Sequence, residues 1–271
     1  MVSGVLKIVS PLDHPDFSTH KHYISYLRRI SNDLRLTLSC ELSRGTTVAP
    51  LARKKVRLIE LTLENIRSEA QMVVKHPEYA QAAISWLPVK AYYLIFNLTI
   101  LLEYLVSANP LLLLSTHEGS LDRFKRLLEG TSISFSEPAF NEIRRGDEIE
   151  KMKVEKSDNI RQTTITRKEQ VYRKFLDYKR ESVRRRARVK RLKKVQMSEI
   201  RNRDFSLSEV FYWYRIKANY GDLEFISDKV PASEFKELYT QYCFLTANFY
   251  KALKKCVNEA SLARTGEILL K

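Results

Sequence analysis

The sequence predicts an all-α protein, an up-and-down helical bundle with a long basic helical insertion. Two observations indicate this class. The 271 residues include only 7 Gly and 8 Pro, whereas β-sandwiches and barrels need turn residues at about every tenth position. Several segments also repeat apolar residues at intervals of three and four, which is the period of one α-helix face. A hydrophobic fraction of 44% supports a packed core and excludes a disordered or fibrous chain.

The N-terminal half is predicted to contain an irregular leader followed by helices. Residues 1–20 contain two prolines and three nearby histidines and read as a leader, and a helical period then predicts a helix over 23–38. From Leu51 a strongly amphipathic pattern predicts a long helix. That helix is expected to end at His76, because a residue before proline is pushed out of the α region.

The most apolar part of the chain is expected at the centre of the bundle. A short helix is predicted over 79–87, and Pro88 then begins another in its first turn, where a missing N–H has no cost. The helix over 89–107 is apolar on almost every side, which is typical of a central position. Its length would span a bilayer, but Lys90 and Glu103 would be costly there, so we interpret it as the core helix of a soluble protein.

The remaining elements are predicted from helix N-cap residues, helix-breaking residues and hydrophobic periodicity. Residues 131–166 show little periodicity and are interpreted as loop or weak helix. The expected helices are 121–128, capped by Ser115 or Thr116; 167–195, as one long helix; 206–220, capped by Ser206 or Ser208; and 232–258, capped by Ser233. The chain therefore divides into a leader and helix (1–50), the first part of the bundle (51–130), the basic insertion (131–205) and the second part of the bundle (206–271).

Positive charge is concentrated in one segment. Residues 161–203 contain 17 Lys or Arg and 4 Asp or Glu, while the rest of the chain carries 30 basic and 28 acidic side chains. The alternative interpretation is a solvated helix face, but a dense run of one sign repels itself, which favours a polyanionic partner. The side chains expected to contact nucleic-acid phosphates are Arg173, Lys174, Lys179, Arg180, Arg184, Arg185, Arg186, Arg188, Lys190, Arg191, Lys193 and Lys194.

Metal, cofactor and redox chemistry have little support in the sequence. The cysteines Cys40, Cys243 and Cys256 lack the C-x-x-C spacing, which favours a reducing, cytoplasmic location. His20 and His22 have no fourth fixed ligand nearby, so no metal site is expected. The sequence has no P-loop, Gly-rich dinucleotide turn, G-x-S-x-G or H-E-x-x-H, so no cofactor is expected either.

Two segments carry a family resemblance. The first is Ala91-Tyr-Tyr-Leu-Ile-Phe-Asn97, continued after the apolar helix by Thr116-His-Glu-Gly119 and Phe124. The second is Tyr214-Arg-Ile-Lys-Ala-Asn-Tyr-Gly-Asp222, ahead of the last helix. In this order they resemble the HEPN domain family, whose members show a similar Ala-Tyr-Tyr helix, a Thr-His-Ser-Gly-like cap and an Arg-x-x-Ala-Asp-Tyr segment. The resemblance implies a helical domain built from residues 51–130 and 206–258.

The chain departs from that family at its ribonuclease motif. Ribonuclease members carry Arg-x(4–6)-His, with His as the general base, and no His follows an Arg at this spacing here. The candidates near the corresponding site are Arg215, Asn219 and Tyr220; Arg and Asn can hold a phosphate, and Tyr can stack. Their alternative role is to close the end of a helix. His117 is interpreted as a helix-cap residue rather than as part of a proton relay.

Three functions remain open at this stage. The first is a HEPN-like protein that binds nucleic acid, with RNA favoured over DNA. The resemblance implies a prokaryotic antiviral defence or toxin–antitoxin system as its context. The second is a ribonuclease with a non-standard site around Arg215, Asn219 and Tyr220. The third is a non-catalytic scaffold subunit whose basic helix docks on an acidic protein surface. The first and third make the protein a binding protein rather than an enzyme. A homodimer or a larger complex is expected, and no membrane partner.

Overall fold

A computed structural model describes residues 15–42, 44–45, 47–152, 166–189, 191–219 and 230–270. Within these residues 76% are helical and 5% lie in strands, so the all-α class is confirmed. The sequence signal was sound because helical periodicity extends over most of the chain, whereas the strands are only three residues long.

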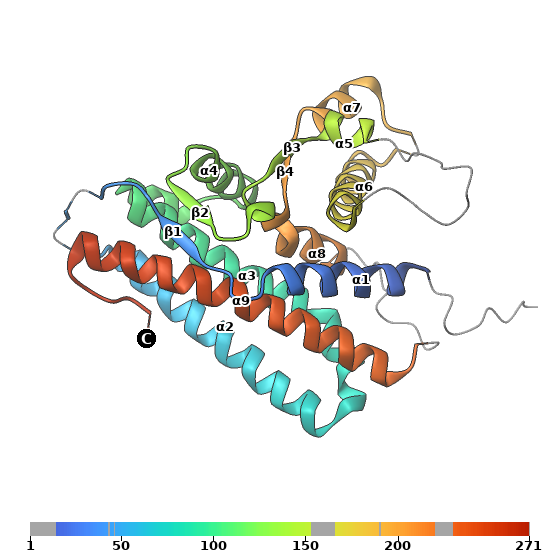
Figure 1. Ribbon diagram of the computed structural model, residues 1–271, viewed down its shortest axis with the longest axis horizontal. Coiled ribbons are helices and arrows are strands. Elements are labelled where there is room, and N and C mark those ends of the chain that lie inside the picture. Colours follow the sequence, from blue (N-terminus) through green and yellow to red (C-terminus); the bar gives the residue numbers. More distant parts are fainter. Residues whose placement is uncertain are drawn as a thin grey trace, which may run out of the picture.

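Four long helices form an elongated bundle (Figure 1). They are α1 (Pro15–Ile30), α2 (Pro50–Lys75), α3 (Ala80–Ser107) and α9 (Ala232–Thr265). Helix α3 packs against both α2 and α9, and most of its side chains are buried, as its apolar sequence predicts. The segment 77–107 is long and apolar enough to cross a membrane by length and composition, and 78% of its most apolar window is buried inside the structure.

Pro88 does not separate two helices. The predicted boundary at this residue is wrong, because α3 runs without interruption from Ala80 to Ser107 with Pro88 inside it. An interior proline removes one hydrogen bond and costs about 3 kcal/mol in an isolated helix. Here Ile84, Leu87 and Ala91 on either side are buried, and packing of that apolar surface stabilises the helix through the proline.

The N-terminal segment also differs from the prediction. Helix α1 begins within the expected leader, and it ends at Ile30 rather than at residue 38. Asp33 then takes a left-handed backbone with φ 57°. The next residues form strand β1 (Leu36–Leu38), antiparallel to β2 (Ile133–Phe135), with Leu36 opposite Phe135. Apolar residues at 34, 36 and 38 alternate with the period of a strand, which sequence analysis assigned to a helix.

The expected loop at 131–166 contains regular structure where it is described. Strand β2 is followed by β3 (Ile143–Arg145), which pairs antiparallel with β4 (Asp204–Ser206). Helix α4 (His117–Glu129) precedes them, and its cap is Thr116, whose Oγ1 accepts a hydrogen bond from the Gly119 N–H at 3.3 Å. Four short 3₁₀ turns complete this part: η1 (Pro77–Tyr79), η2 (Pro110–Leu114), η3 (Pro138–Phe140) and η4 (Leu207–Glu209).

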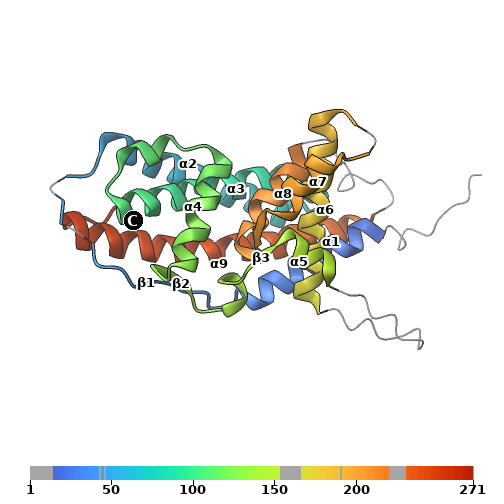
Figure 2. The same cartoon turned by 90° about the horizontal axis from the view of Figure 1, so that it is seen from above.

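Three helices form the insertion, on one side of the bundle (Figures 1 and 2). They are α5 (Gly146–Lys151), α6 (Arg167–Ala187) and α7 (Lys194–Arg201). The prediction of one helix over 167–195 is wrong, because Arg188 turns the chain with a left-handed φ of 51°. The buried face of α6 has no member beyond Val183, and repulsion within the Arg run disfavours further helix.

The last two helices return the chain to the bundle. Helix α8 (Val210–Asn219) follows η4, where the side chain of Ser206 accepts a hydrogen bond from the N–H of Ser208. Helix α9 starts after Pro231 rather than at a Ser233 cap, and it continues to Thr265. Its end is fixed by Gly266 at φ 74°, a conformation that glycine adopts readily. Helix α8 therefore lies between α3 and α6, and it links the bundle to the insertion.

Candidate nucleic-acid interface

The exposed basic residues gather at the end of α6 and in the turn that leads to α7. We call this surface the basic tip; its members are Arg184, Arg185, Arg186, Arg188, Arg191, Lys193 and Lys194, all of them exposed. Lys190 lies outside the described residues. Because α6 ends at Ala187, the tip is a compact group on a helix end and a turn, not a row along one long helix.

Within the described ranges, acidic side chains pair with only part of the basic tip. Arg184 and Arg185 pair with Glu181 at 3.3 and 2.9 Å, and Arg186 pairs with Glu199 at 3.1 Å. Such exposed pairs are weak, so these arginines remain available to a stronger anion. For the other four members, Arg188, Arg191, Lys193 and Lys194, no ion pair is formed within the described part of the chain.

Other predicted contact residues have partners inside the protein. Lys179 is 6% exposed and lies between Glu118 and Glu199. Arg180 pairs with Glu150 and, at 3.1 Å, with Asp177. The remaining two lie along the same helix: Lys174 Nζ lies over the ring of Tyr178, 5.5 Å from its centroid, and Arg173 lines a polar groove beside α5 and α7. Of these four predicted residues on α6, Lys179 is therefore the one removed from the surface.

Arg215 lies on α8 against aromatic rings of α3. Its guanidinium carbon is 4.9 Å from the ring centroid of Tyr92 and 5.6 Å from that of Tyr93. Its Nε is buried and has no hydrogen-bond partner. No carboxylate of the described residues forms an ion pair with Arg215. The other two candidates named with it are not described: Tyr220 and the side chain of Asn219 lie outside the described residues.

His117 is the residue that sequence analysis did not connect with Arg215. It is the first residue of α4 and not its cap, and its Nδ1 lies 2.7 Å from the hydroxyl of Tyr92. The imidazole packs against Phe96, with ring centroids 4.5 Å apart. Burial, then the positive charge of Arg215 and then that of Lys55 lower the pKa of His117. The imidazole is therefore neutral at neutral pH and can accept a proton.

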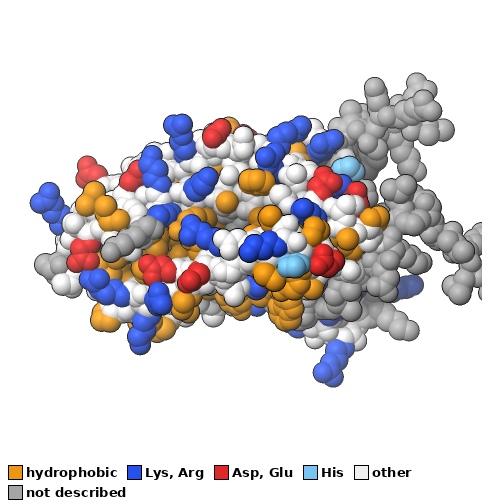
Figure 3. Space-filling model, turned by 90° about the horizontal axis from the view of Figure 1, so that it is seen from below, with side chains coloured by type: hydrophobic (Ala, Val, Ile, Leu, Met, Phe, Trp, Pro, Cys, Tyr) orange, Lys and Arg blue, Asp and Glu red, His pale blue; other side chains and the backbone are white. Residues whose placement is uncertain are grey.

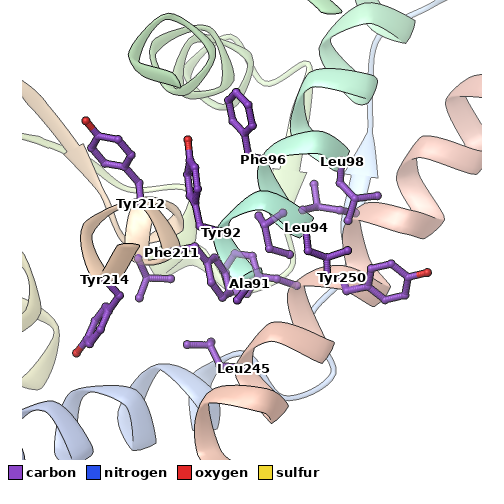
Figure 4. Close-up of a cluster of buried hydrophobic side chains, with 14 of the residues drawn as sticks. Ala91, Tyr92, Leu94, Phe96, Leu98, Phe211, Tyr212, Tyr214, Leu245 and Tyr250 are labelled. Carbon is purple, nitrogen blue, oxygen red and sulfur yellow. The ribbon is translucent and has the colours of Figure 1, made fainter. Parts of the chain in front are cut away.

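The rings of Tyr92 and Phe96, which contact His117, lie near that of Tyr212 (Figure 4). Tyr92 and Phe96 of α3 and Tyr212 of α8 extend to the same side, toward α4. Lys55 of α2 donates a hydrogen bond to Asn97 Oδ1 at 3.1 Å, and burial lowers the pKa of its amine. We call Lys55, His117 and Arg215 the cationic cluster.

The side of the molecule formed by α2 places Lys and Arg side chains next to hydrophobic ones (Figure 3).

A groove of about 490 Å³ opens beside the cationic cluster. It lies between α2 and α3, and its lining includes Lys55, Tyr93 and Asn97. Tyr93 is 38% exposed, so a face or edge of its ring is accessible to a ligand. Lys90, which also lines the groove, is already paired with Glu69 at 2.5 Å. The groove therefore offers the exposed ring of Tyr93 and a half-buried amine, that of Lys55, which lacks a carboxylate partner among the described residues.

A chain of polar contacts connects the cationic cluster with the basic tip. Glu118, next to His117, accepts a hydrogen bond from the Tyr212 hydroxyl at 3.1 Å and lies 3.8 Å from Lys179 Nζ. Lys179 in turn lies 3.4 Å from Glu199, which pairs with Arg186 of the tip. The two basic surfaces are therefore neighbours on the same part of the molecule.

Metal chemistry has no structural support in the described ranges. No group of three or more His, Cys, Asp or Glu side chains there is arranged to hold a metal ion. The three cysteines are free thiols, and burial raises the pKa of Cys243 and of Cys256 to about 12, so both are protonated.

Comparison with protein-family models, with curated proteins and with solved structures finds no match to this chain. The resemblance to the HEPN family therefore stays a prediction from the two sequence segments.

Proposed function

We propose that this protein binds nucleic acid, RNA in preference to DNA, and that the basic tip makes the main contacts. The observation that carries the proposal is the exposure of Arg188, Arg191, Lys193 and Lys194, which form no ion pair with described residues. Cations that the protein does not neutralise attract phosphates and release the counterions condensed on the strand. RNA as the partner, and a role in a prokaryotic defence or toxin–antitoxin system, rest on the HEPN resemblance alone.

The test is the salt dependence of binding to single-stranded RNA. In a four-fold variant, Arg188, Arg191, Lys193 and Lys194 are all replaced by Gln. Each lost phosphate contact on a single strand removes about 0.7 from the slope of log affinity against log salt, so the slope should fall by about 3. The melting temperature should hardly change, because these side chains are exposed.

A three-fold variant is the matched control. Arg184, Arg185 and Arg186 are replaced by Gln in it; these residues are equally exposed but already paired with Glu181 and Glu199. We expect a smaller change in slope than in the four-fold variant. An unchanged slope in the four-fold variant contradicts the proposal. Tighter binding to polyglutamate than to RNA at the same salt concentration favours the scaffold function instead.

A second candidate function is RNA cleavage at the cationic cluster. One observation favours it: His117, held neutral at neutral pH, lies within the electrostatic reach of Arg215. A neutral imidazole can act as a general base on a ribose hydroxyl, and a guanidinium can stabilise charge on the phosphate. Incubation with end-labelled RNA tests this function. Cleavage should disappear in both His117→Gln and Arg215→Gln, and absence of cleavage by the wild-type protein rejects it.

A further inference from the structure

The cationic cluster carries more positive charge than the described residues around it neutralise. Among the described residues, the partners of Arg215 are the faces of Tyr92 and Tyr93, and its buried Nε is unsatisfied there. Lys55 has the neutral amide of Asn97 as its hydrogen-bond partner in the part of the chain that the structure describes. Other half-buried cations nearby differ: Lys90 pairs with Glu69, and Arg123 pairs with Glu103. Two permanent positive charges therefore lie at one site without a carboxylate from the described residues.

These groups act on the same small region. His117 contacts Tyr92, Tyr93 and Phe96, all within two turns of α3. Arg215 packs on two of these rings, and Lys55 reaches Asn97 one residue further along the helix. Both cations lower the pKa of His117, as expected if they approach the imidazole from α8 and α2. The groove beside Lys55, Tyr93 and Asn97 gives solvent access to this region.

We propose that Lys55, His117 and Arg215 bind a phosphate monoester, with the ring of Tyr93 stacking on the base of the nucleotide that carries it. Two permanent cations match the two negative charges of a monoester, whereas a phosphodiester carries one and leaves a cation without a counter-charge. Arg is suited to phosphate because its planar N–H groups donate in parallel. Exposed Tyr rings stack on bases of any sequence.

The source of the monoester is the terminal phosphate of an RNA strand bound at the basic tip. This assignment rests on the proposed function, and it is supported by the contacts that connect the cluster to the tip through Glu118, Lys179 and Glu199. A free mononucleotide has the same chemistry. The experiment therefore first tests the site with small molecules and then tests the source with RNA.

Calorimetry with inorganic phosphate, AMP and adenosine tests the site. Wild-type protein should bind AMP more tightly than phosphate, and adenosine should bind at least 10-fold more weakly than AMP. Arg215→Gln and Lys55→Gln should each weaken AMP binding by about 10- to 100-fold, since each removes a hydrogen bond to a charged group. Lys251→Gln, an exposed cation on α9 away from the cluster, is the control and should leave it unchanged.

His117 supplies a second readout that a merely structural role would not alter. A bound dianion favours the protonated imidazole, so AMP should raise the pKa of His117 by about 1, measured from its Hε1 resonance with His117→Gln for assignment. Circular dichroism and melting temperature check that each variant folds. If Arg215→Gln does not fold, Lys55→Gln, a substitution near the surface of α2, still tests the site. Equal AMP affinity in wild type and in Lys55→Gln overturns the site, as does failure of AMP to bind.

Two RNAs of one sequence, with and without a 5′-phosphate, test the source. Wild type should prefer the phosphorylated strand by about 10-fold, and Arg215→Gln should lose this preference while it still binds both strands. The four-fold tip variant should instead lose affinity for both strands and keep AMP binding. Equal affinity of wild type for the two strands overturns RNA as the source. Unchanged RNA binding in the tip variant overturns the proposed function and leaves the AMP result to stand by itself.

Discussion

Lys179 Nζ lies 3.4 Å from Glu199 Oε1, so an ion pair joins α6 to α7 next to the basic tip. The lysine is almost fully buried, and it also faces Glu118 of α4 at 3.8 Å. One side chain thus contacts two carboxylates from different helices. It holds the insertion against the bundle rather than serving as a contact for a ligand.

Lys179→Met should lower the free energy of unfolding by about 1–2 kcal/mol. The methionine keeps much of the side-chain length but leaves Glu118 and Glu199 without their shared cation, and both carboxylates can partly recover by solvation. Urea denaturation followed by Trp fluorescence measures the change. Lys193→Met, which removes an exposed charge of the tip, is the control and should change stability by less than about 0.5 kcal/mol. A larger effect in the control would contradict this assignment of roles.

Glu209→Ala should be among the most destabilising single substitutions. Glu209 is 1% exposed, forms an ion pair with Lys125 at 3.3 Å and accepts a hydrogen bond from Arg203 at 3.4 Å. Its removal leaves the buried guanidinium of Arg203 without its carboxylate partner and leaves Lys125 with Asp122 as its remaining carboxylate partner among the described residues. Such a change costs about 3–5 kcal/mol. The melting temperature should fall by roughly 10 °C. Glu209→Gln, which keeps an acceptor for these donors, should be milder. A loss below about 1 kcal/mol for Glu209→Ala would show that the network contributes little.

Gly146→Ala should destabilise the contact between α5 and α7. A Cβ at residue 146 would lie 2.2 Å from the carbonyl oxygen of Ile200, so the backbone of one helix has to move. We expect a loss of about 2–3 kcal/mol, typical of overpacking against a rigid neighbour. Gly45→Ala is the matched control, because its nearest contact is the flexible side chain of Arg264 at 3.4 Å. Thermal unfolding of both variants compares them, and equal melting temperatures would contradict the close approach.

The stability contribution of Glu103 should depend on pH in a defined direction. Burial raises the pKa of Glu103 above 4.5, even though Ser120 and Arg123 donate to its carboxylate. The folded state therefore holds the proton more tightly than the unfolded state, and this group's contribution to stability falls as pH rises from 4.5 through the folded pKa. Glu103→Gln lacks the titration. The unfolding free energy of Glu103→Gln minus that of the wild type should therefore increase from pH 4 to pH 8. Urea denaturation measures this difference, and a constant difference would refute the raised pKa.

Arg215→Gln should raise the pKa of His117 in the protein without ligand. The groups that face the imidazole are Tyr92 and Tyr93 of α3, Lys55 of α2, Arg215 of α8 and the adjacent Glu118. Removal of one of the two cations favours the protonated form. Because the folded pKa lies below 6.5, His117 contributes stability above pH 6.5 that is lost as pH falls through the folded value. That loss should be smaller in Arg215→Gln. Proton NMR measures the pKa, and an unchanged value would place the guanidinium away from the ring.

Helical periodicity predicted the long amphipathic and central helices but not their exact limits. Helix α2 was predicted within one residue at each end, because its apolar face, its N-terminal Pro50 and the break at His76 agree. Pro88 and Leu36 were misread for one reason. Local signals predicted a helix break at Pro88 and a helix at Leu36. Burial against other elements instead stabilises a continuous helix through Pro88 and a strand at Leu36. The turn at Arg188 depends on where the buried face of α6 stops, which a charge count does not reveal.

The two parts of the candidate site differ in how far sequence could predict them. Charge counting is enough to find the basic tip, since its residues all lie between positions 184 and 194 of the sequence. Charge counting does not distinguish the buried Lys179 from the more exposed basic residues around it. Its position one helical turn after the buried Phe175 is the signal that could have shown this. Tyr92, His117 and Arg215 meet only after three helices have packed. No local spacing of these residues carries that information.

The order in which helices leave the ribosome has a consequence for α3. This helix is complete at Ser107, but α9, which covers much of it, begins only at Ala232. At about 5–20 residues per second, synthesis of the intervening 124 residues takes roughly 6–25 s. During that interval the nascent chain presents an apolar segment long enough to cross a bilayer, with its final helical partner still missing. Chaperones that hold apolar helices, and targeting factors that recognise membrane spans, would compete for α3 until α9 emerges.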